Sequence, residues 1–251
     1  MKTLKNIGAL LVCIVLVSCS KNDDDSDQGE LLTYLTKITT SNSTTAYYYD
    51  ENNRITLEEV TSTSSQVTLY RNFYNNNGQL IERTEDYTDD SFDYKYTYHY
   101  NAEGNLTKIE TYIIEGGAAP SYHQKNEADY SIPGKISIYR TPYFGTFPFL
   151  EFEYSLDSKG NVLERLVYSP SGALQNTTEY TTFDDKKSPE QLLPKTSYVQ
   201  SFNNNLTYTF TNNSSGVISN LAFTYEYNND GYPTKRTSNT GSITTYEYTK
   251  R

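Results

Sequence analysis

Asn101-Ala102-Glu103-Gly104-Asn105-Leu106 is the clearest copy of a six-residue signature that decides the fold of this chain. The signature has Asp, Asn or Ser first, Gly or Asn fourth and usually an apolar residue sixth; its copies begin at Asp50, Asn75, Asn101, Ser131, Asp157, Ser169, Asn213 and Asn228. A first side chain that accepts bonds from the nearby backbone, followed by a residue that tolerates positive φ, is typical of a type I turn closed by a left-handed residue. Such turns join the two strands of a β-hairpin. The repetition therefore predicts an all-β chain of consecutive hairpins.

The segments beside these turns alternate between aromatic and polar residues. Tyr94, Tyr96, Tyr98 and Tyr100 alternate with Lys95, Thr97 and His99, and residues 150–156, 206–210 and 223–227 follow the same scheme. A period of two with aromatic and β-branched residues predicts half-buried antiparallel strands. One short helical turn is expected at 188–193, where Ser188 precedes Pro189 at the first helical position.

The spacing of the fourth-position residues indicates that the turns lie at two edges of a sheet. A common edge is expected for Asn53, Gly78, Gly104, Gly134, Gly160 and Gly216, together with a degenerate turn at residues 183–187 that ends at Lys187. Gly172 and Gly231 are out of phase with that series and are expected at the opposite edge. Residues 62–66, 86–90, 116–117, 141–148 and 203–205 are expected as irregular links at that opposite edge.

Residues 34–251 are therefore predicted to form one β-repeat domain, a single antiparallel meander built from tandem hairpin units of about 27 residues. A meander of about 15 strands exceeds the roughly ten strands at which strongly twisted open sheets curl or split. We expect a half-pipe, a superhelical ribbon or a loose barrel with tyrosines on its concave side. Tyrosine is expected to supply much of the buried area, since the chain has 26 Tyr, no Trp and only 35% apolar residues.

The N-terminal residues predict export and a lipid anchor. Lys2 and Lys5 precede an apolar run at 7–17, which is short for a transmembrane helix and typical of a signal peptide. The run ends in Leu16-Val17-Ser18-Cys19, which resembles the bacterial lipobox. The resemblance implies that residues 1–18 are removed, that Cys19 carries the lipid and that 19–33 form an acidic flexible tether. An ordinary signal peptide with a chance Cys is the alternative.

Charge and the tether refine the expected location and partners. Ser20 stands where Asp commonly retains a lipoprotein at the inner membrane, and residues 21–25 resemble an acidic export signal of Bacteroidota surface lipoproteins. We expect an outer-membrane lipoprotein exposed at the cell surface, with the periplasmic face as the alternative. The net charge of −10 argues against a nucleic-acid partner and against attachment through anionic lipid headgroups. The membrane contact is thus expected through the N-terminal lipid alone.

The signature together with the tyrosine before it resembles a known repeat. Residues 98–106, 47–55 and 152–162 resemble the YD repeat of Rhs/teneurin-type surface and toxin proteins. Residues 183–189 are similar to a segment of short Bacteroidota lipoproteins built from such repeats, mostly domains of unknown function. The resemblance covers about residues 34–251 and implies a coiled β-repeat architecture more than an activity.

Residues with catalytic or metal-binding chemistry are sparse and show no established spacing. His99 and His123 are expected as separate surface residues, and the acidic groups Asp23–Asp25 and Asp89-Asp90 as solvated charges. Glu151 and Glu153 are expected on one strand face about 7 Å apart. That distance is compatible with glycoside hydrolysis, whereas solubility is the alternative role. No catalytic residue, metal or cofactor is predicted.

The row formed by Tyr94, Tyr96, Tyr98 and Tyr100 is the candidate ligand-binding surface. These rings could stack on sugars or on a partner's apolar patch, or they could form the core of the curled sheet. The sequence thus favours a non-enzymatic, lipid-anchored binding or scaffold module with a protein or glycan ligand. The alternatives are a carbohydrate-binding lipoprotein that uses exposed tyrosines and a hydrolase with a carboxylate site.

Overall fold

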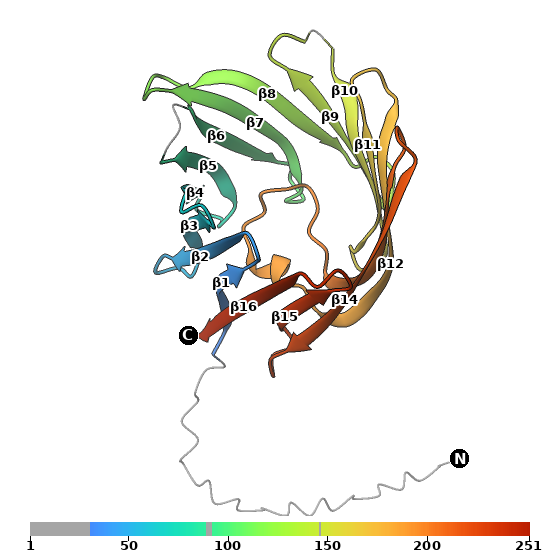
Figure 1. The fold of residues 1–251 in the computed structure, drawn as a ribbon. Helices are drawn as coiled ribbons and strands as arrows, with labels where there is room; N and C mark the ends of the chain where they lie inside the picture. The colour runs from blue at the N-terminus through green and yellow to red at the C-terminus, as the bar shows by residue number, and fades with distance from the viewer. Residues whose placement is uncertain (1–30, 89–91, 146) are drawn as a thin grey trace, which may run out of the picture. The chain divides into compact units, whose positions relative to one another are not determined.

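The computed structural model describes residues 31–88, 92–145 and 147–251, and within them residues 33–251 form a closed antiparallel barrel of 16 strands (Figure 1). Each strand pairs with its sequence neighbours, and β1 (Thr33–Thr39) pairs with β16 (Ile243–Lys250) to close the ring. The predicted all-β meander is confirmed. Closure into a barrel selects one of the three expected shapes, and the strand number is 16 where about 15 were expected from the repeat length.

The remaining strands follow one another around the barrel with short connections and one long one. They are β2 (Ser43–Tyr49), β3 (Ile55–Ser62), β4 (Val67–Tyr74), β5 (Leu80–Tyr87), β6 (Phe92–Tyr100), β7 (Leu106–Glu115), β8 (Ser121–Asp129), β9 (Lys135–Pro142), β10 (Phe149–Leu156), β11 (Val162–Tyr168), β12 (Leu174–Lys187), β13 (Asn203–Asn212), β14 (Val217–Tyr227) and β15 (Pro233–Ser238). The 3₁₀ turn η1 (Pro189–Leu192) lies in the long connection, and Ser188 caps it as predicted.

The signature forms the predicted turns at six of its copies, which begin at Asp50, Asn75, Asn101, Asp157, Ser169 and Asn228. The copies at Ser131 and Asn213 turn differently, since the N–H of Lys135 bonds the carbonyl of Ile132 and the N–H of Gly216 bonds that of Asn212. In the β10–β11 turn, Asp157 Oδ1 accepts bonds from the backbone N–H groups of Lys159 and Asn161, at 2.8 and 2.9 Å. Gly160 has a φ of 91°, and Asn53 takes the equivalent left-handed position in the β2–β3 turn with a φ of 61°. The strand register shifts beside the turn, between Ser155 and Leu156. The extra residue of this bulge explains why apolar residues on both faces follow the turn in the sequence.

The expected division of the turns between two edges is correct as far as Gly172 and for the position of Lys187, and it is wrong for Gly216 and Gly231. Residues 183–187 do not turn but continue β12, and the link to β13 is made by residues 188–202. Gly216 therefore lies at the same end of the barrel as Gly172, and Gly231 at the end of Gly160. Residues 203–205, expected as a link, belong to β13.

Asp184 explains the wrong turn prediction. Its carboxylate accepts bonds from the backbone and side-chain nitrogens of Asn204 on the neighbouring strand, at 3.1 and 3.0 Å, and from the hydroxyl of Tyr227. Asp184 also accepts the backbone N–H of Lys186, as a turn residue does. The Asp184 carboxylate, whose counterparts in other repeats close a turn, thus also bonds neighbouring strands. Residues 183–187 therefore remain extended in β12.

Tyrosines immediately before the turns link successive hairpin units. The hydroxyls of Tyr74, Tyr100 and Tyr130 donate to the backbone carbonyls of Ile55, Leu80 and Leu106, at 2.7, 2.8 and 2.7 Å respectively. Each acceptor is the apolar sixth residue of the preceding turn of the series. Because these acceptor residues are buried, each phenol supplies a partner to a carbonyl at the inner wall. The tyrosine before the Asp or Asn of the repeat thus has a structural role.

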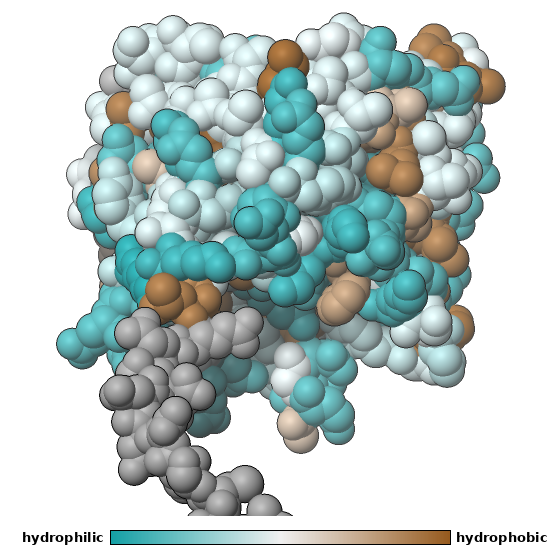
Figure 2. Space-filling model, turned by 90° about the horizontal axis from the view of Figure 1, so that it is seen from below, coloured by the Kyte–Doolittle hydropathy of each residue, from teal (hydrophilic) through white to brown (hydrophobic). Residues whose placement is uncertain are grey.

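The inner face of the wall carries the aromatic row and the outer face carries ion pairs. Tyr96 and Tyr98 line an interior cavity, and Tyr98 packs with the buried Leu80 and Leu106. On the opposite face of the strands, Lys and Glu pair around the barrel: Lys37–Glu247, Lys95–Glu82, Lys108–Glu110, Lys125–Glu127, Lys135–Glu153 and Lys235–Glu226. Figure 2 views the molecule from one side, where hydrophobic residues form separate patches among hydrophilic ones.

Residues 188–202, here called the interior segment, enter the barrel between β12 and β13 and return at the same end (Figure 1). Leu192 and Leu193 pack against the core cluster that contains Leu35 and Tyr246. The hydroxyl of Tyr198 donates to the carbonyl of Asn126 at 2.5 Å and accepts the N–H of Ile109 at 3.1 Å. Barrels of 16 strands are wider than their wall side chains can fill. The interior segment therefore supplies part of the core.

The tyrosine links predict a stability effect that does not depend on apolar burial. Tyr100→Phe keeps the ring but leaves the carbonyl of Leu80 without its donor, so we expect a loss of about 1–2 kcal/mol in unfolding free energy. Urea unfolding followed by tyrosine fluorescence measures it. Tyr139→Phe, at an exposed outer position, is the matched control and should change stability by less than about 0.5 kcal/mol. Equal effects of the two substitutions would contradict the linking role.

The turn geometry predicts a dependence on acid. Burial alone raises the pKa of Asp157, but hydrogen bonds from Asn161, Lys159 and Gly160 outweigh it and lower that pKa on balance. A carboxyl pKa below its unfolded value adds stability above about pH 4, and this stability is lost as pH falls through the folded pKa. Asp157→Ala should cost about 1–2 kcal/mol at neutral pH.

Asp157→Asn is the control, because Asn opens the equivalent turns at Asn75 and Asn101 and keeps the acceptor oxygen. It should retain neutral-pH stability and reduce the loss of stability between pH 4 and pH 2, a range set by carboxyl titration. Urea midpoints measured across that range check both variants. An unchanged acid response of Asp157→Asn would assign the pH dependence to other carboxyls.

Candidate ligand-binding site in the barrel interior

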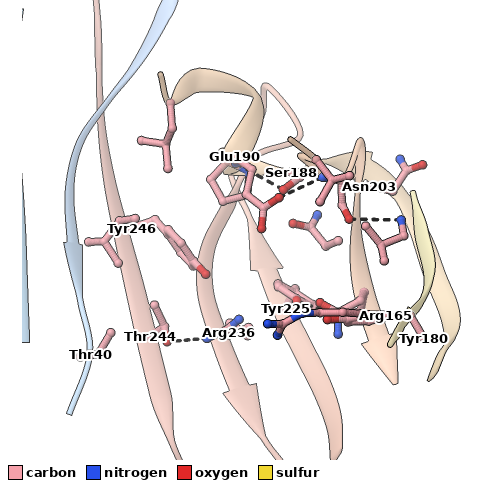
Figure 3. Close-up of a pocket in the computed structure, with 18 of the residues that line it drawn as sticks. Thr40, Arg165, Tyr180, Ser188, Glu190, Asn203, Tyr225, Arg236, Thr244 and Tyr246 are labelled. Carbon is pink, nitrogen blue, oxygen red and sulfur yellow. Dashed lines mark hydrogen bonds between the residues drawn. The ribbon is translucent and has the colours of Figure 1, made fainter. Parts of the chain in front are cut away.

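A cavity of about 520 Å³ lies between the interior segment and the wall formed by β10 to β16 (Figure 3). Its polar and aromatic lining includes Tyr154, Arg165, Tyr180, Glu190, Asn203, Tyr225, Arg236 and Tyr246. Thr40, in the β1–β2 connection at the barrel end opposite the entry of the interior segment, also lines it. We call this space the arginine cavity, after its two guanidinium groups.

Arg165 projects inward from β11, where it faces Tyr154 of β10 and Thr178 of β12 across the sheet. Its guanidinium carbon lies 4.8 Å from the centre of the Phe152 ring. The side chain also lies close enough to the hydroxyls of Tyr154 and Tyr180 to oppose the rise of their pKa values. Its Nε is buried and has no hydrogen-bond partner among the described residues.

Arg236 projects inward from β15 between Tyr225 of β14 and Thr244 of β16. It donates to the Thr244 hydroxyl at 3.2 Å, and its guanidinium carbon lies 5.0 Å from the centre of the Phe223 ring. In Figure 3, Arg236, Tyr225, Arg165 and Tyr180 extend across the wall in one row. Aromatic faces thus hold both guanidinium groups without neutralising them.

Glu190 approaches this row from the opposite side, from η1 of the interior segment (Figure 3). Its carboxylate accepts the backbone N–H of Ser201 at 2.9 Å. Burial raises the pKa of Glu190, although the bond from Ser201 and the charge of Arg236 oppose the rise. The lining of the arginine cavity therefore contains two guanidinium groups and one carboxyl group.

The tyrosines of the cavity are neutral hydrogen-bonding groups. Burial raises the pKa values of Tyr154, Tyr180, Tyr225 and Tyr246, so their hydroxyls stay protonated at physiological pH. Tyr180 packs against Tyr208 with ring centres 5.6 Å apart. Each ring can present an apolar edge or face and a hydroxyl that donates or accepts.

A second interior cavity of about 450 Å³ contains two of the predicted tyrosines and two carboxylates. Tyr96 and Tyr98 line it together with Glu85 and Glu151. Glu85 accepts hydroxyls from Tyr70 at 2.9 Å, from Tyr96 at 2.5 Å and from Tyr87. Glu151 binds Arg140 and Asn126 at 2.8 and 2.7 Å. Both carboxylates are therefore engaged by neighbouring side chains.

The other two members of the predicted tyrosine row also face inward. Tyr94 stacks on Tyr96 with ring centres 6.4 Å apart, and Tyr100 donates to Leu80. The row is continuous with the core and is not an exposed stacking surface. A binding role remains a prediction for these residues, and Tyr96 and Tyr98 are the two that line a cavity.

The expectation that Glu151 and Glu153 share a strand face is wrong. A register shift between Leu150 and Phe152 places Glu151 in the second cavity, whereas Glu153 pairs with Lys135 on the outer face. His99 lies on the outer face, where its Nε2 is 2.8 Å from Oε2 of Glu110. His123 accepts the N–H of Tyr143 through its backbone carbonyl.

Some expected residues fall outside the described part of the chain. They are Cys19, Asp23–Asp25 and Asp89-Asp90. Within the described ranges, no three or more His, Cys, Asp or Glu side chains gather as a metal-binding group. Within the same ranges, no helix is both long enough and apolar enough to cross a membrane.

The arginines of the site were not predicted, although the sequence contains a signal for them. Arg83, Arg165 and Arg236 each stand five residues after a turn glycine, at Gly78, Gly160 and Gly231. All three line interior cavities. The bulge beside the turn shifts the inward face by one residue, so simple alternation from the turn misplaces them.

The comparisons with known proteins support the barrel fold. Neither protein-family models nor curated proteins match the sequence. A porin-like protein from Bacteroides vulgatus matches the structure with a TM-score of 0.53 and 12% identity, over 87% of this chain and 99% of that one. A porin-like protein from Bacteroides uniformis matches over 87% of this chain and 95% of its own, with 16% identity and a TM-score of 0.37. The chain therefore shares a porin-like barrel fold with the first of these proteins.

Proposed function

We propose that this chain is a lipid-anchored, non-catalytic binding protein whose barrel stands in water beside the outer membrane and takes its ligand into the interior. The observation that carries the proposal is the division of the barrel wall into an outer face with ion pairs and an inner face with aromatic cavities.

The outer face favours water over lipid. A transmembrane barrel presents an apolar band to the bilayer, and a Lys or Arg at the bilayer midplane costs about 2–4 kcal/mol. Here the strands carry ion pairs at outward positions, among them Lys95–Glu82 and Lys135–Glu153, with 2.5 Å between the ammonium nitrogen and a carboxylate oxygen in each. Further pairs lie around the ring. Although its fold is shared with a porin-like protein, the polarity of its wall suits a barrel surrounded by water.

The interior favours binding over catalysis. The carboxylates of the second cavity are held by tyrosines, Arg140 and Asn126, and Glu190 accepts a backbone N–H. Hydrolysis by a carboxylate pair needs one acid and one base that are free to act on a substrate. A cavity of about 520 Å³ has the size of a small-molecule site, and its aromatic and polar side chains can orient a ligand.

The anchor at Cys19 and the exposure at the cell surface complete the proposal. Both come from the lipobox resemblance and the acidic residues after Cys19. Two or more acyl chains give stable attachment without any spanning segment. The periplasmic face of the outer membrane remains the alternative location.

Carbohydrate binding is the second candidate, and the lining of the arginine cavity favours it. Tyr154, Tyr180, Tyr225 and Tyr246 surround this space together with Asn203. Aromatic faces pack against the C–H faces of sugars, and amide and phenol groups bond sugar hydroxyls. The tyrosines in question are interior ones, in contrast to the exposed row considered from the sequence.

The proposal predicts where the protein is found when the anchor is removed. Cys19→Ala should move the protein from the membrane fraction to the aqueous fraction, because the acyl chains are the proposed membrane contact. The released protein should be monodisperse without detergent and should retain the tyrosine near-ultraviolet circular dichroism of a packed interior. Fractionation, gel filtration and circular dichroism measure these outcomes.

Ser18→Thr, which leaves Cys19 in place, is the control for changes near the cleavage site. If Cys19→Ala, with the removal of residues 1–18 verified by its mass, stays in membranes and leaves them only with detergent, the barrel is embedded and the proposal is wrong. If it stays in membranes but is washed off by carbonate, another attachment replaces the lipid, and the proposed anchor is wrong.

A further inference from the structure

We propose that the arginine cavity binds a small carboxylated saccharide, a sugar acid, through Arg165 and Arg236. This inference rests on the proposed binding function and names its ligand class.

The guanidinium groups of Arg165 and Arg236 differ from those elsewhere in the interior. Arg83 pairs with Glu58 at 2.6 Å and Arg140 pairs with Glu151 at 2.8 Å. Within the described ranges, neither Arg165 nor Arg236 has a carboxylate within 4.0 Å. A half-buried charge without a close counter-charge is unfavourable, and an anionic ligand would supply one.

The position of the Arg165 guanidinium at the cavity wall points to the same ligand class. The guanidinium carbon of Arg165 lies over the Phe152 ring, 4.8 Å from the ring centre, and its Nε is buried without a hydrogen-bond partner among the described residues. A guanidinium binds a carboxylate through two parallel N–H bonds in that plane. The terminal N–H groups of Arg165 at the cavity wall would therefore suit a planar carboxylate.

The rest of the lining fits a saccharide body. Tyr154, Tyr180, Tyr225 and Tyr246 offer ring surfaces and neutral hydroxyls, and Asn205 adds an amide group. The volume of about 520 Å³ is in the range of cavities that hold small ligands. An inorganic anion would leave the ring surfaces unused, whereas a neutral sugar would leave both guanidinium groups unpaired.

Glu190 sets the charge that the cavity accepts. It faces the arginine row from the interior segment (Figure 3), and its interaction with Arg236 already offsets part of the positive charge. Two guanidinium groups and one carboxylate leave room for one further negative charge. The geometry thus favours a monoanion, such as a uronate, over a dianion.

The test is calorimetric titration of the full mature chain carrying Cys19→Ala with galacturonate and glucuronate. Glucose and galactose are the neutral counterparts, and sulfate and phosphate are the simple anions. We expect at least one uronate to bind at least tenfold more tightly than its neutral counterpart and than either simple anion. Arg165→Gln and Arg236→Gln should each weaken uronate binding about tenfold or more, since each removes a charged partner.

Two further variants separate the site from general electrostatics and from folding. Glu190→Gln should tighten uronate binding severalfold, because it removes the competing carboxylate. Arg71→Gln makes the same change of charge at an exposed outer position and should leave binding unchanged. If Arg165→Gln fails to fold, Arg165→Lys takes its place in the test. This variant keeps the charge without the planar fork and should also weaken uronate binding.

Each remaining outcome overturns part of the proposal. Equal binding of uronates and neutral sugars would favour a carbohydrate site without anion recognition. Equal binding of sulfate and uronates, or equal loss in Arg71→Gln, would indicate an unspecific response to charge. Failure of every uronate to bind would refute the ligand class, while the fractionation of Cys19→Ala would still decide the proposed anchor and the barrel's location independently.

Discussion

The hydrogen bond from a tyrosine hydroxyl to the carbonyl that follows the previous turn is the interaction on which the rest of the barrel depends. Tyr74, Tyr100 and Tyr130 make it at three successive units, with distances of 2.7–2.8 Å. A turn signature fixes only the geometry within one hairpin. The tyrosine fixes the offset between one hairpin and the next and satisfies a carbonyl at the inner wall. Regular repetition of that offset carries β16 around to β1.

Closure creates an interior that the wall cannot fill. A barrel of 16 strands leaves an open lumen unless other groups enter it. Here the interior segment and the inward tyrosines occupy that volume, and the space left between them forms the cavities. The core is thus made of phenols, paired charges and a loop, as expected for a chain with 35% apolar residues. Such a core is both the source of stability and the lining of the proposed site.

The sequence predicted most of the fold because turns and alternation are local. Asp157 and Gly160 determine their turn with neighbouring atoms only, so reading them needs no knowledge of the rest of the chain. The wrong assignment at Asp184 has a non-local cause, since its carboxylate bonds Asn204, 20 residues away. Bulges had the same effect at Glu151, because one extra residue exchanges the inner and outer faces.

The site was less predictable than the wall. Arg165 and Arg236 belong to different hairpins, and only closure and curvature place them in one cavity with Glu190. Their common offset from a turn glycine is visible in the sequence, yet its meaning depends on the bulge that follows each turn. The resemblance to YD repeats remains a prediction, and the structural match reported above is to a porin-like protein.

The interior segment leaves the wall at Lys187 and rejoins it at Asn203, which are paired neighbours at one end of the barrel. Because both of its ends lie at one end of the barrel, the segment can change in length without altering the register of any ladder, provided that its contacts with the wall through Leu192, Leu193 and Tyr198 are kept. Closing a longer loop costs little additional entropy. Changes in this one stretch of about 15 residues can therefore enlarge, shrink or chemically alter the arginine cavity, while the repeats that build the wall stay as they are.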